Sequence, residues 1–280
     1  MITAEEKKYI LSCAYVPEHS VGLITLVSGG EPFLIDGYFC CRKDDWLIVV
    51  GYPLEGKFSS NEFENFFEKI KKRFRPKHIS LMTPELPLSI TGTCREKQSD
   101  YFYTLNIQRF ALEGALKRAV NKAREILSVE RSVEIGQAHN DLAQEFIKRA
   151  NPPPRVRELF AKIPDYVNAS TQSVAINAWD EKHNLAAYYV VDLAAKNFST
   201  YVIGCHSKTH YTPGASDLLC YEMINMSKER GKEYIHLGLG VNEGIRRFKK
   251  KWGGRATLKY EMCDLDLKKP SLLETIFALR

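Results

Sequence analysis

The residues best suited to chemistry lie between Thr209 and Gly254. A Thr-Pro-Gly-Ala-Ser turn leads into two helix-like segments with a glycine-containing strand between them, and polar groups gather at the ends of these elements. Ligands of open α/β sheets bind at strand ends and helix N-termini. We therefore expect the functional site in this stretch.

A basic segment near its end predicts a helix packed on a sheet, with Asn242 as its N-cap. Its apolar residues recur at helical spacing: Val241, Ile245, Phe248 and Trp252. Its basic residues are Arg246, Arg247, Lys249, Lys250 and Lys251. At about 100° per residue, Lys249 lies nearest the apolar face and Lys250 lies opposite. Lys249 is a candidate catalytic residue, and the alternative is that the whole set forms a solvated basic face.

The turn before the first helix is a second candidate. Pro213-Gly214 requires a tight turn, and Ser216 suits the helix N-cap. Free N–H groups near Gly214, Ala215 and Ser216 could hold a phosphate or carboxylate, although a plain capped helix has the same pattern. His210 and Tyr211 offer an imidazole and a hydroxyl for proton transfer.

Cys205 and His206 end a predicted strand at 198–206. Adjacent strand residues point to opposite faces, so the two cannot act together as nucleophile and base. His236 lies within a buried-looking strand and is expected to be a core histidine. Glycines 238 and 240 form only a weak dinucleotide signal, because the full G-x-G-x-x-G pattern is absent. The tyrosines at 188, 189 and 201 are expected to pack on the sheet.

The elements that position these residues follow an α+β order. The second half reads as a strand at 132–137, helices at 139–150 and 155–162, and strands at 173–179, 185–192 and 198–206. A helix at 216–230, a strand at 234–239, a helix at 242–252 and a strand at 256–264 follow. The first half reads as strands at 32–41 and 46–52, a helix at 61–74 and a strand at 78–82. A long basic helix at 106–127 connects the halves, which predicts domains at 1–128 and 129–280.

Composition is that of a globular protein with 44% hydrophobic and 26% charged residues and a net charge of +6. Seven scattered cysteines favour reduced, buried thiols over a disulfide framework, and dispersed histidines give no metal site. The N-terminus is charged, and no apolar run suits a membrane span. A cytoplasmic location is therefore expected. The charge is compatible with an anionic partner, and the oligomeric state is not predicted.

Several motifs carry a resemblance to the GNAT acyltransferase superfamily. Three antiparallel strands lead into strand-helix-strand-helix-strand, and the Pro-Gly turn at 213–214, the Leu-Gly strand at 237–240 and the Phe-Lys-x-x-x-Gly ending at 248–253 are similar to those of Fem peptidyltransferases. The basic helix at 115–124 also resembles the connector of phosphatidylglycerol lysyltransferases. The resemblance implies two GNAT-like halves, each a mixed, mostly antiparallel sheet flanked by helices, with the first half abbreviated.

The resemblance also implies an activity and a site. It implies transfer of an acyl or aminoacyl group to an amine on a small molecule, lipid or peptide, with Lys249 meeting the charge of the donor or tetrahedral intermediate. Donor-binding residues would be Cys205, His206, Gly214, Ala215, Ser216 and Phe248. The Gln/Arg-x-x-Gly-x-Gly/Ala motif that binds CoA pyrophosphate is absent from 206–216, so aminoacyl-tRNA and acyl-CoA both stay open as donors. The alternatives are a non-catalytic binding protein of this fold and an RNA-binding module.

Overall fold

The computed structural model describes residues 1–267, which separate into two compact units. Unit 1 contains Met1–Ile2, Gly30–Ser99 and residues 259–267, and unit 2 contains Thr3–Gly29 and Asp100–Leu258. These units follow contacts in space, whereas the expected domains at 1–128 and 129–280 follow the order of elements along the chain. That sequence-based division stays a prediction.

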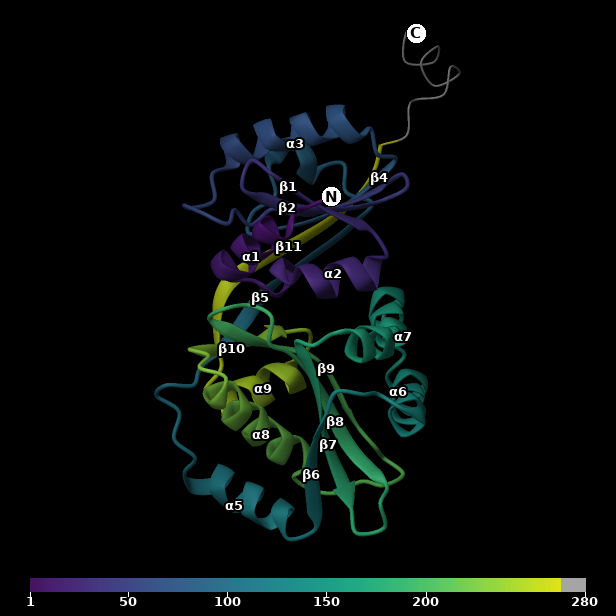
Figure 1. The fold of residues 1–280 in the computed structure, drawn as a ribbon, viewed down its shortest axis with the longest axis vertical. Coiled ribbons are helices and arrows are strands. Elements are labelled where there is room, and N and C mark those ends of the chain that lie inside the picture. Colours follow the sequence, from purple (N-terminus) through teal and green to yellow (C-terminus); the bar gives the residue numbers. More distant parts are fainter. Residues whose placement is uncertain (268–280) are drawn as a thin grey trace. The chain divides into compact units, whose positions relative to one another are not determined.

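Unit 1 is a mixed sheet packed against one long helix (Figure 1). Its elements are β1 (Glu31–Ile35), β2 (Tyr38–Lys43), β3 (Trp46–Val50), α3 (Ser60–Phe74), β4 (His78–Thr83), α4 (Leu88–Thr91), the start of β5 (Glu96–Asn106) and most of β11 (Arg255–Asp266). The strand order is β1-β2-β3-β4-β11, with β3 and β4 parallel. The predicted single strand at 32–41 is in fact a hairpin, because Asp36 and Gly37 both adopt positive φ and turn the chain.

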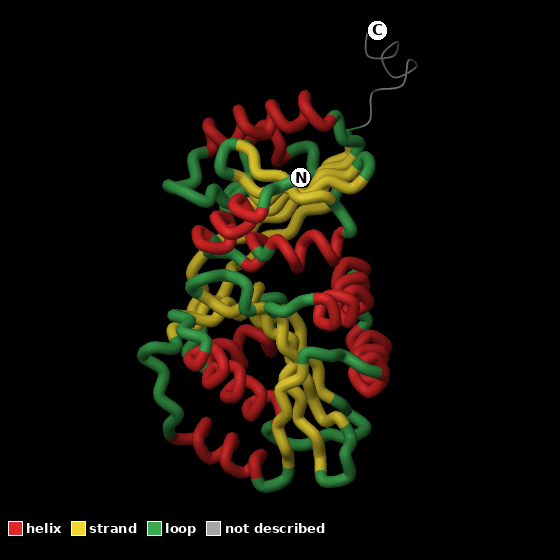
Figure 2. Tube along the Cα trace, in the orientation of Figure 1, coloured by secondary structure: helices red, strands yellow, loops and turns green. Residues whose placement is uncertain are grey.

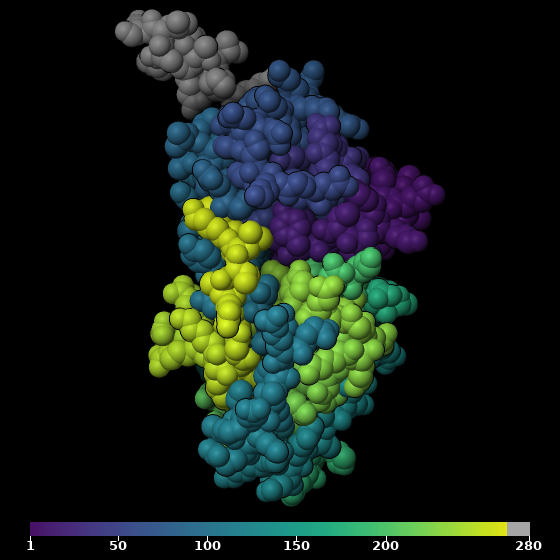
Figure 3. Space-filling model, turned by 90° about the vertical axis from the view of Figure 1, so that its left-hand side faces the viewer, coloured from purple at the N-terminus to yellow at the C-terminus, as the bar shows by residue number. Residues whose placement is uncertain are grey.

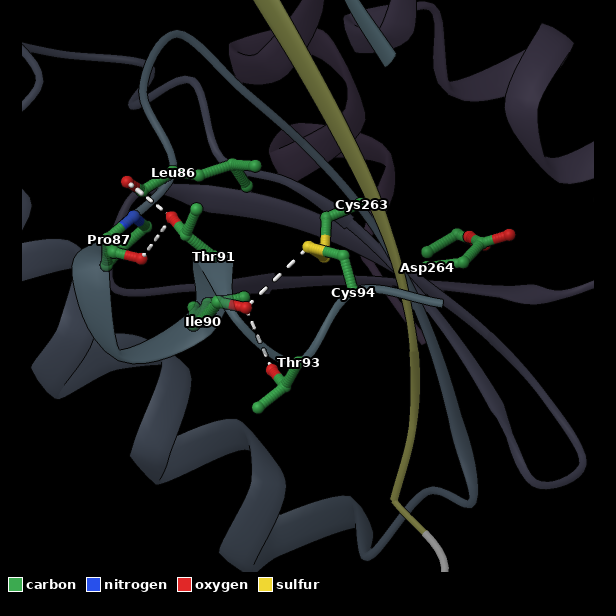
Figure 4. Close-up of a disulfide and its surroundings, with 9 residues drawn as sticks. Leu86, Pro87, Ile90, Thr91, Thr93, Cys94, Cys263 and Asp264 are labelled. Carbon is green, nitrogen blue, oxygen red and sulfur yellow. Dashed lines mark hydrogen bonds between the residues drawn. A yellow bond between two sulfur atoms is a disulfide. The ribbon is translucent and has the colours of Figure 1, made fainter. Parts of the chain in front are cut away.

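A disulfide in unit 1 corrects the expectation that all seven cysteines are reduced. Cys94, just after α4, bonds to Cys263 in β11 (Figure 4). The other five cysteines form no disulfide. The two bonded residues are 169 positions apart, and the fold brings them together where Arg95 N–H donates to the Asp264 carbonyl. Spacing along the sequence carries no signal for such a pair.

In unit 2 a mixed sheet has helices on both faces (Figures 1 and 2). Its elements are α1 (Ala4–Cys13), a 3₁₀ turn (Pro17–His19), α2 (Val21–Ser28), the rest of β5, α5 (Gly114–Arg124), β6 (Leu127–Ser132), α6 (Gln137–Ala150), α7 (Pro154–Ala169), β7 (Ser173–Asp180), β8 (Leu185–Asp192), β9 (Phe198–His206), α8 (Ala215–Glu229), β10 (Tyr234–Leu239), α9 (Glu243–Lys251) and the start of β11. The strand order is β11-β5-β10-β9-β8-β7-β6. Strands β9 and β10 pair in parallel, whereas the pairs β5–β10, β8–β9, β7–β8 and β6–β7 are antiparallel. One apolar core lies under α5, α8 and α9, and another under α2, α6 and α7. The first residues of β11, in yellow, are exposed on the face shown in Figure 3.

Several elements of unit 2 differ from the sequence-based expectation. The long helix expected at 106–127 is the end of β5, an irregular segment and the shorter α5, which begins at Gly114 with a φ of +56°. The strand expected at 132–137 lies earlier, as β6, where Leu127 is buried against β7. Helices α1 and α2 were not predicted. No helix within residues 1–267 has both the length and the apolar character needed to cross a membrane.

The helix-strand-helix segment predicted for the site region is confirmed. Helix α8, strand β10 and helix α9 lie within a residue or two of their expected bounds. Asn242 caps α9 by accepting the Ile245 N–H at 2.9 Å, as predicted. The cap of α8 is instead Gly214, in the left-handed region at a φ of +83°, so the expected N-cap Ser216 lies inside the first turn.

Candidate functional site

A cavity of about 360 Å³ opens in unit 2 where β9 and β10 separate. The register that pairs these parallel strands ends at Thr200 and His236. Beyond it, β10 shifts its register against β5 between His236 and Leu239, and Gly238 adopts a φ of +72°. A β-bulge of this kind bends a strand and redirects its side chains. We call the space the β9–β10 cavity.

The walls of the β9–β10 cavity come from β8, β9, β10, α8 and α9, and most of its side chains are apolar. They are Tyr189, Tyr201, Val202, Gly204, Cys205, His206, Ser216, Cys220, Met223, Leu237, Gly238, Leu239, Val241, Gly244, Ile245, Phe248, Lys249 and Trp252. Concave, mostly apolar cavities with a few polar groups are the usual form of small-molecule sites.

The cavity brings together part of the predicted site. Its lining includes the following predicted residues: Cys205, His206, Ser216, Phe248 and Lys249. Gly214, Ala215, His210 and Tyr211 are outside the lining, and the Tyr211 side chain is 57% exposed. The assignment of all nine to donor binding or catalysis stays a prediction.

Lys249 is the charged group of the cavity wall. It is only 6% exposed, and its ammonium donates to the Leu239 carbonyl and lies 5.6 Å from the centre of the Tyr103 ring. Burial lowers the pKa of Lys249 from 10.5 to about 8, against the smaller opposing effect of Asp100. At pH 7 the side chain is therefore mostly a cation held in an apolar setting.

The turn between β10 and α9 is fixed by Asp100. Its carboxylate accepts the Val241 N–H at 2.8 Å, and a Cβ on Gly240 would lie 2.7 Å from its other oxygen. Val241 is held at a φ of +55°, a conformation that β-branched residues rarely adopt. This turn determines where α9 begins and so where Lys249 points.

Two of the tyrosines expected to pack on the sheet, Tyr189 and Tyr201, belong to the apolar core of unit 2 and also line the cavity. Tyr189 and Tyr201 meet edge to face at 4.8 Å, and Tyr189 donates to the Ser216 carbonyl at 3.1 Å. Gly204 leaves room for them, because a Cβ there would lie 2.5 Å from the Tyr201 hydroxyl oxygen. Burial raises the pKa of both phenols, so they are neutral hydroxyls. The sequence signal that could have indicated this role is Gly204, a glycine inside a strand of otherwise larger residues.

The loop after β9 is anchored to α6 by Glu145. This carboxylate accepts the Ser207 hydroxyl at 2.9 Å and the Lys208 N–H at 2.5 Å, and Arg149 pairs with it at 3.1 Å. Burial raises the pKa of Glu145, but these hydrogen bonds and the Arg149 charge outweigh it and lower the pKa overall. Glu145 was not predicted, since the loop residues that it holds, Ser207 and Lys208, lie more than 60 positions away.

Neither Cys205 nor His206 is arranged for nucleophilic catalysis. Burial raises the pKa of the Cys205 thiol to about 12, so a thiolate does not form near neutrality. Burial, with Arg149 and Lys208 nearby, lowers the pKa of His206. His236 is 1% exposed with a pKa lowered to about 3 by burial, as expected of a core histidine. Among the described residues, no group of three His, Cys, Asp or Glu side chains is placed to hold a metal.

Comparison with solved structures identifies the fold. The C-terminal DUF2156 domain of a protein assigned as lysylphosphatidylglycerol synthetase from Agrobacterium fabrum matches 99% of this chain and 96% of its own, with a TM-score of 0.63 and 14% identity. FemX matches 93% of this chain and 96% of its own, with a TM-score of 0.62 and 11% identity. A tandem GNAT protein from the clavulanic acid biosynthesis pathway matches 83% of this chain and 79% of its own, with a TM-score of 0.54 and 10% identity.

No protein-family model and no curated protein matches the sequence. At these identities the structural matches establish the fold and nothing finer. The chain has a mixed α+β fold similar to GNAT-like proteins of the Fem and lysylphosphatidylglycerol synthetase type, which confirms the resemblance inferred from its sequence.

Proposed function

We propose that this chain is an acyl- or aminoacyl-transferase that binds an activated donor in the β9–β10 cavity and transfers its acyl group to an amine. The observation that carries the proposal is the cavity itself, which places the Lys249 cation inside an apolar space at the end of two separating strands. Proteins of the same fold include enzymes of this general class, such as the matched synthetase.

The reaction requires no covalent enzyme intermediate. The acceptor nitrogen attacks the donor carbonyl carbon, a C–N bond forms, and the C–S or C–O bond to the donor breaks. The proton lost by the amine passes to water or to the leaving group. Backbone N–H groups at the end of β9 would polarise the carbonyl, and Lys249 would stabilise the negative charge that develops on its oxygen or lies on the donor.

Two donor classes stay open, acyl-CoA and aminoacyl-tRNA, and the surroundings of the cavity favour one of them. The loop at 207–214 lacks the glycine-rich pattern that binds CoA pyrophosphate, and Glu145 occupies its Lys208 N–H. A donor that relies less on this loop, such as aminoacyl-tRNA, is therefore the first choice, and acyl-CoA is the second. The acceptor would be an amine on a small molecule, a lipid or a peptide.

Labelled donors test the proposal. The protein is incubated with acyl-CoA or with aminoacyl-tRNA, and acceptor-dependent consumption is measured for small, peptide and lipid amines. We expect consumption of one donor class, with turnover greatly reduced in Lys249→Met and retained in Lys250→Met, which removes a charge from an exposed position of the same helix. If the wild-type protein consumes neither donor with any acceptor, a non-catalytic binding role replaces this proposal.

A further inference from the structure

The described residues that form the walls of the β9–β10 cavity carry no carboxylate. Among the described residues that line it there is no aspartate and no glutamate, and the ionised group is the positive Lys249. The deep wall is built from side chains such as Cys220, Met223, Leu237 and Trp252, each at most 5% exposed. A cation that entered this space would lose its hydration without gaining a counter-charge.

Three acidic groups that flank the cavity walls are already engaged. Glu243, next to the lining residue Gly244, pairs with Arg247 at 3.5 Å. Asp217 accepts from Lys251 at 2.7 Å and from the Trp252 indole at 3.0 Å. Asp100 accepts the Val241 N–H at 2.8 Å and faces Arg246 at 4.0 Å. None of these three residues lines the cavity. A second positive group would therefore meet the Lys249 cation with no carboxylate among the described lining residues to offset it.

We infer that the β9–β10 cavity selects a donor whose transferred group ends in an uncharged, apolar side chain, and that it rejects a lysyl-type cation. The inference rests on the proposed function and concerns the chemical class of its donor. The names of the lysylphosphatidylglycerol synthetases of similar fold imply a lysyl donor. The inference gives this chain a donor of a different chemical class. A volume of about 360 Å³ is sufficient for a leucyl, phenylalanyl or short acyl group.

The sharpest test compares donors that differ only by one terminal ammonium. Norleucyl and lysyl groups are attached through a stable amide to 3′-amino-3′-deoxyadenosine, and hexyl and 6-aminohexyl groups are attached to CoA as thioethers. The α-amino group is common to both aminoacyl compounds, so the comparison isolates the side chain. Dissociation constants are measured by isothermal titration calorimetry at pH 7 with the full-length protein.

We expect either the adenosine pair or the CoA pair to bind. Within that pair, the uncharged compound should bind at least about tenfold more tightly than the cationic compound. Equal or tighter binding of the cationic member overturns the inference and leaves the proposed function intact. If no compound of either scaffold binds, the donor site itself is wrong, and the inference falls together with the proposed function.

A charge introduced into the wall gives a second readout. Ile245 lines the cavity and is 36% exposed, so Ile245→Glu adds a carboxylate at a position that tolerates it. We expect this variant to narrow or reverse the preference for the uncharged ligand. Leu88→Glu is the matched control, because Leu88 is 93% exposed in unit 1, and it should keep the wild-type ratio. The wild-type comparison decides the inference even if Ile245→Glu does not fold.

Discussion

Replacing Lys249 with methionine is expected to make the protein more stable near neutral pH while impairing its site. The lysine is 6% exposed, and burial has lowered its pKa from 10.5 to about 8. At any pH at which Lys249 is protonated in the folded protein, its ammonium is a charge that would be better hydrated in the unfolded chain. Methionine keeps a similar shape and removes the charge.

The size of the effect follows from the two pKa values. A difference between 10.5 and about 8 corresponds to about 3 kcal/mol at 1.36 kcal/mol per pH unit. Below pH 8 both states are protonated and the full cost is present. Between pH 8 and 10.5 the unfolded chain retains a proton that the folded protein has lost, so the stability of the wild type rises with pH. Loss of the hydrogen bond to the Leu239 carbonyl offsets part of the gain, which leaves about 1–2 kcal/mol at pH 7.

Urea denaturation at pH 7 and pH 10 measures both quantities. The free energy of unfolding of Lys249→Met should exceed that of the wild type at pH 7. The difference between the two proteins should then shift by about 2–3 kcal/mol in favour of the wild type at pH 10. Other lysines and tyrosines titrate in both proteins and cancel in this difference.

Lys250→Met controls for loss of a positive charge from α9, because Lys250 is exposed on the same helix. It should change stability by less than about 0.5 kcal/mol and show no such pH shift. The reasoning is refuted if Lys249→Met is less stable than the wild type at pH 7 and the difference between them does not change with pH. In that case the lysine would be a structural residue whose contacts outweigh its desolvation.

Three other changes test separate parts of the structure. Gly204→Ala places a methyl group 2.5 Å from the Tyr201 hydroxyl oxygen, so we expect at least about tenfold weaker binding of the donor analogues by calorimetry, and unchanged binding would contradict the position of the site. Glu145→Gln removes the charge that anchors the loop after β9, so amide exchange in that loop should accelerate at pH 7. In the wild type the same acceleration should appear only as the pH falls below 4.5 toward the lowered pKa of Glu145. Replacing Cys94 and Cys263 by serine removes a cross-link over 169 positions and should lower the free energy of unfolding by about 2–4 kcal/mol in urea, whereas no change would show that the bond adds no stability.

The parts of the site region set by local signals were predictable. The helices at 215–229 and 243–251 carry helical apolar spacing and turn residues at their ends, and the position of Lys249 near the packed face followed from the same periodicity. The capping role of Asn242 is equally local. These features depend on neighbours within a few positions, which a single sequence contains.

The cavity was not predictable, because it forms where two strands separate. Strand β10 has the expected bounds, but only the fold shows that its pairing with β9 ends at His236. For the same reason Tyr189 and Tyr201 looked like ordinary sheet residues, since alternation along a strand does not distinguish a core from a cavity wall. The bond between Cys94 and Cys263 likewise depends on pairing between segments far apart in sequence.

Two locally unfavourable features meet at the β9–β10 cavity. Val241 is the one β-branched residue with positive φ among the described residues, a conformation that costs about 1–3 kcal/mol. Lys249 adds the desolvation of a buried cation. Asp100 holds the first in place and partly compensates the second. Such costs are typical of sites where a fixed backbone must present a charge to a ligand, and their coincidence at one cavity supports the proposal that this cavity binds the donor.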